Sequence, residues 1–169
     1  MMETQIIPVF TRAEIETVAG LAKIIWTEHY VPIIGQEQVD YMVAKFQSPE
    51  AIENQVKQEG YAYFIITASG QPVGYIGIIE KSNELFLSKL YVLSDERGKG
   101  FGRTGIDFLT AECRNKGLEF ISLTVNKNNL LTISAYEKMG FEKYGEMVGD
   151  IGSGYVMDDY LMRKRIYPV

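Results

Sequence analysis

The sequence predicts a single α/β domain with a mixed central β-sheet. Runs of β-branched and aromatic residues between Tyr61 and Val92 predict neighbouring strands, and a glycine-rich stretch near residue 100 separates a strand from a helix. The 169 residues are 46% hydrophobic, which is enough for one continuous core. We therefore expect one domain that covers residues 1–169.

Helices are expected in the first third of the chain. Thr11 is a candidate N-cap, and apolar residues recur behind it at helical spacing. Pro32 and Gly35 are expected to break that helix. The expected elements are a strand at 4–10, the helix behind Thr11, a second helix at 39–46 and a short helical piece at 50–58.

The next three strands are expected to form an antiparallel meander, because short turn-forming connections join them. The helix that follows the meander is flanked by two strands that should be parallel, which makes the sheet mixed. Asn129 is a candidate N-cap for a later helix, which Gly140 would end. The expected ranges are strands at 63–67, 73–79, 85–93, 120–125, 141–147 and 155–166, and helices that run through residue 116 and from 129 to 139.

Charge and composition exclude several classes of partner. The net charge of -5 and the pI near 5.0 argue against nucleic-acid binding, and Arg163-Lys164-Arg165 is interpreted as the solvated end of the last strand. Neither a signal peptide nor a long apolar run is present, so no membrane is expected. Cys113 is the only cysteine, which excludes a disulfide and predicts a cytoplasmic location. We expect Cys113 to be a small buried residue, and we expect no metal.

A glycine-rich turn lies between a predicted strand and a predicted helix, where backbone amides are available to an anion. A P-loop would need Ser or Thr after Lys99, where the chain has Gly100. Residues 100–105 match the dinucleotide pattern G-x-G-x-x-G, but Val125-Asn126-Lys127 offers no acidic residue for a ribose. A turn without a ligand is the other alternative. The turn itself reads Arg97-Gly98-Lys99-Gly100-Phe101-Gly102-Arg103.

Two motifs resemble those of the GNAT superfamily of N-acetyltransferases. The family's pyrophosphate turn, Arg/Gln-x-x-Gly-x-Gly/Ala, is matched by Arg97, Gly100 and Gly102. Its Asn-x-x-Asn-x-x-Ala-x-x-x-Tyr-Glu-Lys-x-Gly-Phe signature is matched by Asn126, Asn129 and Tyr136-Glu137-Lys138-Met139-Gly140-Phe141. The chain departs from the family at Thr132, in place of the signature's Ala, and at Gly105, which we expect to permit close packing on the sheet. The resemblance implies the GNAT fold, with about seven strands and helices on both faces.

The resemblance implies acetyl-CoA as the cosubstrate. It implies that the backbone amide of Val92 stabilises the tetrahedral oxyanion and that Tyr136 protonates the departing thiolate. A core tyrosine is the alternative for Tyr136. The implied cofactor-binding residues are Leu90, Tyr91, Val92, Arg97, Gly98, Lys99, Gly100, Phe101, Gly102, Arg103, Asn129, Tyr136 and, for the 3′-phosphate, Lys138.

The resemblance does not determine which residue removes the proton from the amine. Glu80, near the end of the strand at 73–79, is the first choice, with His29 and Glu28 behind it. A solvated strand end is the alternative for Glu80, and a residue at a helix end is the alternative for His29. The segment after the first helix concentrates aromatic and polar groups, and the expected acceptor-binding residues are Trp26, Glu28, His29, Tyr30 and Tyr41.

The overall resemblance is nearest to bacterial polyamine N-acetyltransferases, and it includes Asp158-Asp159-Tyr160 in the last strand. It implies transfer of an acetyl group to a primary amine, a small cationic one such as a polyamine, by direct attack in a ternary complex. The alternatives are acetylation of a protein amino terminus and a non-catalytic acyl-CoA-binding sensor. A small-molecule amine is the expected partner, and the sequence is compatible with a homodimer.

Overall fold

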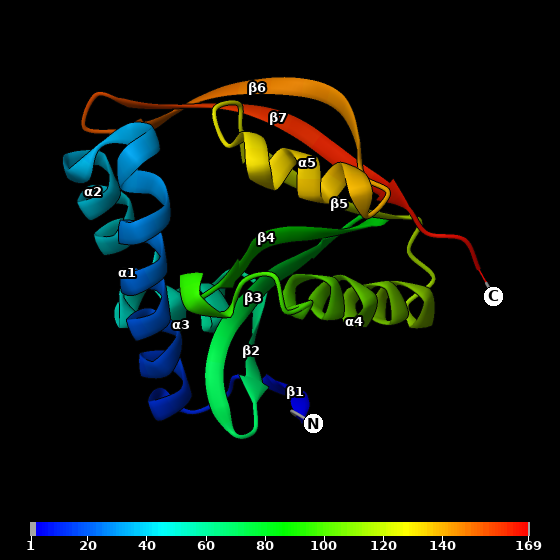
Figure 1. Cartoon of the computed structure of the whole chain (residues 1–169). Coiled ribbons are helices and arrows are strands. Elements are labelled where there is room, and N and C mark those ends of the chain that lie inside the picture. Colours follow the sequence, from blue (N-terminus) through cyan, green and yellow to red (C-terminus); the bar gives the residue numbers. More distant parts are fainter. Residues whose placement is uncertain (1–2, 169) are drawn as a thin grey trace. The chain divides into compact units, whose positions relative to one another are not determined.

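The computed structural model describes residues 3–168, and these residues form five α-helices, one short 3₁₀ helix and seven strands (Figure 1). The helices are α1 (Arg12–Ile34), α2 (Gln36–Phe46), α3 (Pro49–Gln58), α4 (Phe101–Asn115) and α5 (Leu130–Lys138), with the 3₁₀ helix η1 (Ser94–Glu96) before α4. The strands are β1 (Thr4–Pro8), β2 (Tyr61–Ala68), β3 (Gln71–Lys81), β4 (Glu84–Val92), β5 (Phe120–Asn126), β6 (Glu142–Gly152) and β7 (Tyr155–Arg165).

The strands form one mixed sheet in the order β1-β2-β3-β4-β5-β7-β6. The pairs β1–β2, β2–β3, β5–β7 and β6–β7 are antiparallel. β4 and β5 are parallel, and Glu84 lies opposite Phe120 at their start. The prediction of a mixed sheet with parallel strands around α4 is therefore confirmed.

The chain divides into two compact units. The first comprises the residues up to Ile79 together with Lys89–Ile106, and the second comprises Glu80–Ser88 together with the residues from Asp107 onward. Each unit thus contains segments that are distant in sequence. The prediction that residues 1–169 form one domain stays a prediction.

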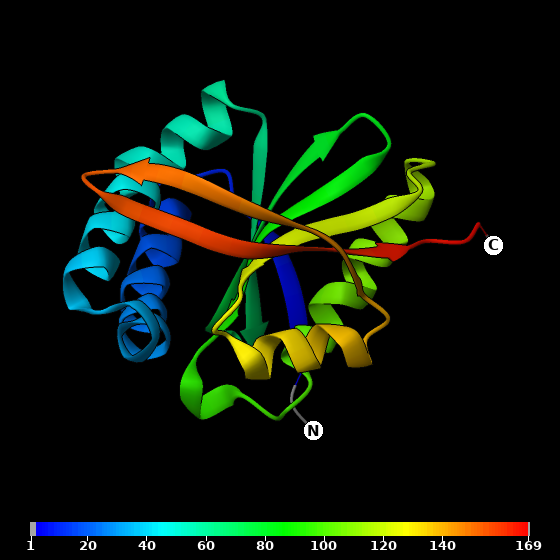
Figure 2. The same ribbon diagram turned by 90° about the horizontal axis from the view of Figure 1, so that it is seen from above.

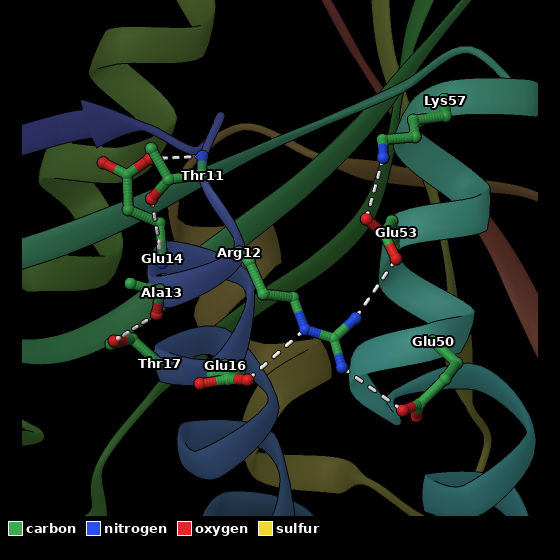
Figure 3. Close-up of polar contacts among 9 residues, drawn as sticks. All are labelled: Thr11, Arg12, Ala13, Glu14, Glu16, Thr17, Glu50, Glu53 and Lys57. Atoms are coloured by element: carbon green, nitrogen blue, oxygen red, sulfur yellow. Dashed lines mark hydrogen bonds and ion pairs between the residues drawn. The ribbon is translucent and has the colours of Figure 1, made fainter.

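Helix α1 begins at the predicted N-cap, Thr11, and the structure adds a capping box with Glu14 (Figure 3). The Thr11 hydroxyl accepts a hydrogen bond of 3.2 Å from the Glu14 amide, and the Glu14 carboxylate accepts one of 2.8 Å from the Thr11 amide. The next residue, Arg12, donates to Glu50 and Glu53 of α3, at 3.2 and 3.1 Å. These contacts fix the start of α1 against α3.

The prediction that Pro32 breaks the first helix is wrong, because α1 continues through Pro32 to Ile34. Proline lacks the N–H that would bond to the Glu28 carbonyl, but so close to the helix end the chain loses only that bond. The helix ends at Gly35, whose φ is 90° and whose amide donates to the Val31 carbonyl at 2.9 Å. The predicted break at Gly35 is confirmed.

Several predicted element ends are displaced. β1 ends at Pro8 instead of residue 10, because the amides of Phe10 and Thr11 bond to Glu14. β6 continues to Gly152 instead of ending at 147, and it forms a long hairpin with β7 (Figure 2). Asn129 occupies the N-cap position of α5, but its side chain makes no capping hydrogen bond.

Helices cover both faces of β3, as the resemblance implied. Tyr75 accepts a hydrogen bond of 2.9 Å from the Trp26 indole of α1. The next residue, Ile76, has its Cδ1 atom 3.3 Å from the position of a β-carbon at Gly105 in α4. Successive side chains of a strand point to opposite faces, so α1 and α4 pack on opposite sides of β3.

A chain of buried hydrogen bonds connects the first three helices to β2 and β3. The Tyr75 hydroxyl donates to Gln47 Oε1 at 2.6 Å, and Gln47 Nε2 donates to the Tyr63 hydroxyl at 3.1 Å. Tyr63 in turn donates to Gln55 Oε1 at 2.5 Å. Burial raises the pKa of Tyr63 and of Tyr75, so both phenols stay protonated and act as donors. With the bond from Trp26, these contacts satisfy polar groups from five separate segments.

Cys113 is fully buried, as its place among apolar residues predicts. Its sulfur lies 3.4 Å from the Leu118 carbonyl oxygen, and burial raises the pKa of the thiol. The thiol is therefore held in its neutral form.

Candidate active site

The glycine-rich turn has the geometry of an anion site. Gly98 and Gly100 have φ of 79° and 87°, the left-handed region that side chains rarely adopt. No atom outside the local chain lies within 4 Å of a β-carbon placed at Gly98, Gly100 or Gly102. Helix α4 begins at Phe101, and its first backbone bond joins the Thr104 amide to the Gly100 carbonyl at 3.0 Å. The amides of residues 101–103 come before that bond, and such first-turn amides can bind a phosphate.

Side chains hold this turn in place. Phe101 is buried, with 4% of its surface exposed, and anchors the start of α4. Lys99 forms an ion pair of 3.0 Å with Glu96, and Arg97 Nε donates to the Val92 carbonyl at 3.2 Å. Arg103 is exposed. Backbone amides and cationic side chains are therefore both exposed at this turn.

The end of β4 approaches β3 very closely. A β-carbon at Gly74 would overlap the Tyr91 carbonyl oxygen and would lie 3.2 Å from Val92 Cα. Beyond this point the Leu93 amide donates to the Val73 carbonyl at 2.8 Å. On the other face, a β-carbon at Gly105 would lie 3.0 Å from Leu90 Cδ1, which confirms the close packing expected there.

One aromatic cluster contains four of the predicted residues: Trp26, His29 and Tyr30 of α1 and Tyr91 of β4. The Tyr30 and Tyr91 hydroxyls are 2.9 Å apart and hydrogen-bonded. The Trp26 ring meets the rings of Tyr30 and Tyr91 edge-on, with centroids 5.6 and 5.5 Å apart, and His29 packs against Tyr30 at 4.8 Å. Tyr41 lies on α2, where its hydroxyl accepts a hydrogen bond from Lys45. The acceptor-binding residues predicted on α1 are thus brought to the end of β4.

The two carboxylates that the sequence suggested as bases have different surroundings. Glu28 Oε2 accepts a hydrogen bond of 2.7 Å from the Ser94 hydroxyl, two residues after Val92. Glu80 is half exposed and lies 3.9 Å from the Lys116 ammonium group. Along β3, Glu80 is seven residues from Val73, the residue that bonds to Leu93, which is about 23 Å of extended chain. Glu80 therefore lies at the opposite end of β3 from the residue that contacts Leu93.

Tyr136 is buried in α5, with 8% of its surface exposed. Its ring packs edge-on against Phe141 at a centroid distance of 5.3 Å. Asn129 is also buried, at the start of the same helix, whereas Lys138 is exposed at its end. The packing of Tyr136 fits both a core role and a role in proton transfer.

Two charged groups that were not among the predicted site residues have shifted pKa values. Lys89 lies on β4, 5.4 Å from the centre of the Tyr61 ring, and burial lowers its pKa to about 8. Asp159 lies on β7, with 4% of its surface exposed, and burial raises its pKa to about 6. The sequence places Asp159 in an acidic pair, but the pair does not tell which member is buried.

The described part of the chain, residues 3–168, contains no cluster of three or more His, Cys, Asp or Glu side chains suited to a metal ion. Among the same residues, no helix combines the length and the apolar character needed to cross a membrane.

Residues 19–141 match the acetyltransferase (GNAT) family, and the chain therefore belongs to this family. Because both motifs behind the resemblance lie within the matched residues, family membership agrees with the turn and the α5 signature described above.

Curated relatives match about half of the chain. An uncharacterized N-acetyltransferase of Methanocaldococcus jannaschii is 26% identical over 95 residues, which are 52% of this chain and 42% of that protein. An L-methionine sulfoximine/L-methionine sulfone acetyltransferase of Pseudomonas aeruginosa is 27% identical over 96 residues, 53% of this chain and 56% of that protein. The chain thus spans about half the length of the curated relatives that it matches.

Solved structures with the same fold match nearly the whole chain. The PaiA N-acetyltransferase of Thermoplasma acidophilum, in complex with coenzyme A, has a TM-score of 0.80 at 21% identity, and the match covers 97% of this chain and 99% of that one. The ribosomal-protein-S18-alanine N-acetyltransferase of Escherichia coli has a TM-score of 0.73 at 17% identity, and the match covers 99% and 96%. These likenesses establish the GNAT fold.

Proposed function

We propose that the chain is an N-acetyltransferase that transfers the acetyl group of acetyl-CoA to a primary amine of a small cationic molecule such as a polyamine. The observation that carries the proposal is the turn before α4, where Gly98 and Gly100 open the backbone and the helix begins at Phe101. Membership of the GNAT family supports it, and so does the presence of coenzyme A in the structure of the T. acidophilum protein of the same fold.

The residues of the turn fit the cosubstrate. In the proposal, amides between Arg97 and Arg103 bind the pyrophosphate, and Lys138 binds the 3′-phosphate. Main-chain groups of Leu90 and Val92 pair with the pantetheine arm. Arg97 already donates a hydrogen bond to the Val92 carbonyl. When the pantetheine arm binds, the Arg97 guanidinium would either share that carbonyl oxygen with it or give up the hydrogen bond. When bound, acetyl-CoA supplies an activated acetyl carbonyl.

Two further groups of the chain serve the reaction in this proposal. The Val92 backbone amide donates a hydrogen bond to the oxygen that becomes negatively charged. Tyr136 supplies a proton to the departing sulfur, because a phenol with a reference pKa near 10 can protonate a thiolate whose conjugate acid has one near 8.5. The acceptor would lie against Trp26, Tyr30 and the neighbouring side chains of α1.

Glu80 as the base of the reaction stays a prediction. A Glu80→Gln variant tests it, since unchanged turnover would remove Glu80 from the mechanism. A cytoplasmic location and a homodimer also stay predictions. Analytical sedimentation at several protein concentrations tests whether the protein forms the homodimer.

The test of the proposed function is release of free thiol from acetyl-CoA in the presence of different amines. The panel contains spermidine, spermine, an aminoglycoside, a peptide with a free amino terminus, and L-methionine sulfone, which the name of a relative suggests. We expect turnover with the polyamines. Turnover with the peptide alone would indicate an amino-terminal acetyltransferase, and calorimetric binding of acetyl-CoA without turnover on any amine would indicate a sensor.

A further inference from the structure

A cavity lies beside the last strand, β7, near the start of β5. Its volume is about 290 Å³, which suits a small molecule. All of the residues that line it belong to the second compact unit. None of them is a residue assigned above to acetyl-CoA or to the acceptor, so the proposed function leaves this cavity without a role. The lining residues are Phe120, Gly140, Glu142, Arg163, Arg165 and Tyr167.

The side chains of Arg163 and Arg165 gather around one aromatic ring. The Arg163 Cζ atom lies 4.4 Å from the centre of the Phe120 ring, and the Arg165 Cζ atom lies 5.8 Å from the same centre. Each guanidinium group also has a second ring, that of Tyr144 at 4.7 Å from Arg163 and that of Tyr167 at 5.7 Å from Arg165. Attraction between a cation and a ring uses none of the N–H donors of the guanidinium group. These donors therefore remain available to a ligand.

No ion pair neutralises the two arginines within residues 3–168. The ion pairs of this part of the chain include neither arginine, and they do not include Glu142, which lines the same cavity. Glu84 lies opposite Phe120 in β4, but it does not line the cavity. Two cations beside one ring repel each other, so a bound anion would stabilise both.

Paired strands hold the walls of the cavity. Arg165 lies opposite Phe120 of β5, and Arg163 lies opposite Glu142 of β6. Beyond the end of β7, the carbonyl of Tyr167 accepts a hydrogen bond of 3.0 Å from the last turn of α4. A cavity whose walls are already in place costs little free energy of ordering when a ligand binds.

The charges of the cavity indicate the class of ligand. Two cations and one carboxylate line it, and their complement is a molecule with two oxyanions and one ammonium group. Arg163 and Arg165 are two residues apart, so they share a face of β7 and their backbones are about 6.6 Å apart. Guanidinium groups bind carboxylates through paired N–H donors, and an ammonium group supplies donors to a carboxylate such as that of Glu142.

We propose that this cavity binds an acidic amino acid, with its two carboxylates on Arg163 and Arg165 and its ammonium group on Glu142. The ligand binds through charge and hydrogen bonds, and no covalent bond changes. The inference goes beyond the proposed function and does not depend on it, since a protein that acetylates no amine could still bind this ligand.

The test is calorimetric titration of the full chain, without acetyl-CoA. The probes are L-glutamate, glutarate, which keeps both carboxylates but lacks the ammonium group, L-glutamine, which has one carboxylate, and inorganic phosphate. The variants are Arg163→Gln, Arg165→Gln and Glu142→Gln. The control is Lys143→Gln, which removes a cation from the next position of β6, on the opposite face of the strand. Melting temperature is measured for every protein.

We expect the parent protein to bind L-glutamate more tightly than the other three probes. Each arginine variant should weaken that binding at least about tenfold, because a hydrogen bond between charged groups contributes that much affinity. Glu142→Gln should remove the preference for L-glutamate over glutarate, and Lys143→Gln should stay within a few-fold of the parent.

Three results would overturn the inference. One is a folded parent protein that does not bind L-glutamate at millimolar concentration, and another is phosphate or glutarate binding as tightly as L-glutamate. The third is an equal loss of affinity in Lys143→Gln and in the arginine variants, which would indicate general attraction to a basic surface. If an arginine variant does not fold, the comparison of L-glutamate with glutarate in the parent and in Glu142→Gln still decides the question.

Discussion

Gly74 of β3 lies directly against the peptide between Tyr91 and Val92 of β4. A β-carbon at this position would overlap the Tyr91 carbonyl oxygen and would lie 3.2 Å from Val92 Cα. Neither contact involves a flexible side-chain end, so the backbone of one strand would have to move. The position of the Val92 amide therefore depends on a glycine in the neighbouring strand.

Gly74→Ala should lower both stability and turnover. Overpacking of this kind costs about 1–3 kcal/mol of unfolding free energy, and displacement of a reacting group by about 1 Å costs about a hundredfold in rate. Denaturant unfolding and kcat measure the two effects. The control is Gly20→Ala in α1, where nothing lies within 4 Å of the added carbon and where alanine should stabilise the helix. Equal behaviour of the two variants would contradict the prediction.

Gly102→Leu should weaken binding of acetyl-CoA without loss of folding. Gly102 lies in the first turn of α4 and has open space around it, so the side chain is accommodated but covers the amides. We expect calorimetric affinity to fall at least about tenfold, since bound phosphate needs close backbone approach. Gly20→Leu is the matched control. An unchanged affinity would place the cosubstrate elsewhere.

Tyr136→Phe should keep the fold and lose turnover. The substitution retains the ring that packs on Phe141 and removes only the hydroxyl. If that hydroxyl protonates the departing sulfur, kcat should fall by about a hundredfold or more. Tyr144→Phe, at an exposed tyrosine of β6, serves as control. Full activity of the Tyr136 variant, with parental melting temperature, would leave Tyr136 a packing residue.

Asp159 should make the protein less stable as the pH rises from about 4 to 6. Its pKa is raised from 3.8 to about 6 on folding, so the folded state binds more protons than the unfolded state in this window. The free energy of unfolding therefore falls with pH, by no more than about 3 kcal/mol, because solvent screens part of the effect. Asp159→Asn should lack this loss, and unfolding curves at several pH values compare the two proteins. Parallel pH profiles would show that Asp159 keeps an ordinary pKa.

Much of the fold follows from local chemistry that the sequence displays. Thr11, as a candidate N-cap, predicts the start of α1, and the glycines between Arg97 and Arg103 predict the turn before α4. The parallel pair around α4 follows from the connection alone. These features depend on residues that are close in sequence.

The remaining features depend on partners that are distant in sequence. Asp158 and Asp159 are chemically equal in the sequence, and only the register of β7 against β5 decides which one is buried. The prediction for Pro32 failed because a proline near a helix end costs a single hydrogen bond, and the bond from Gly35 to Val31 still closes the helix. The sequence also does not show which end of β3 bonds to Leu93. In the structure it is the end with Val73, and Glu80 lies at the other end.

The hydrogen bonds of Gln47 and Gln55 limit how far α2 and α3 can move along the strands. They join the end of α2 and the middle of α3 to Tyr63 and Tyr75 of the sheet. A shift of either helix along the strands would leave several buried groups without partners, at about 1–3 kcal/mol each. Descendants of this sequence should therefore change by exchange of side chains on an unmoved backbone in this region, and insertions should accumulate outside α2 and α3.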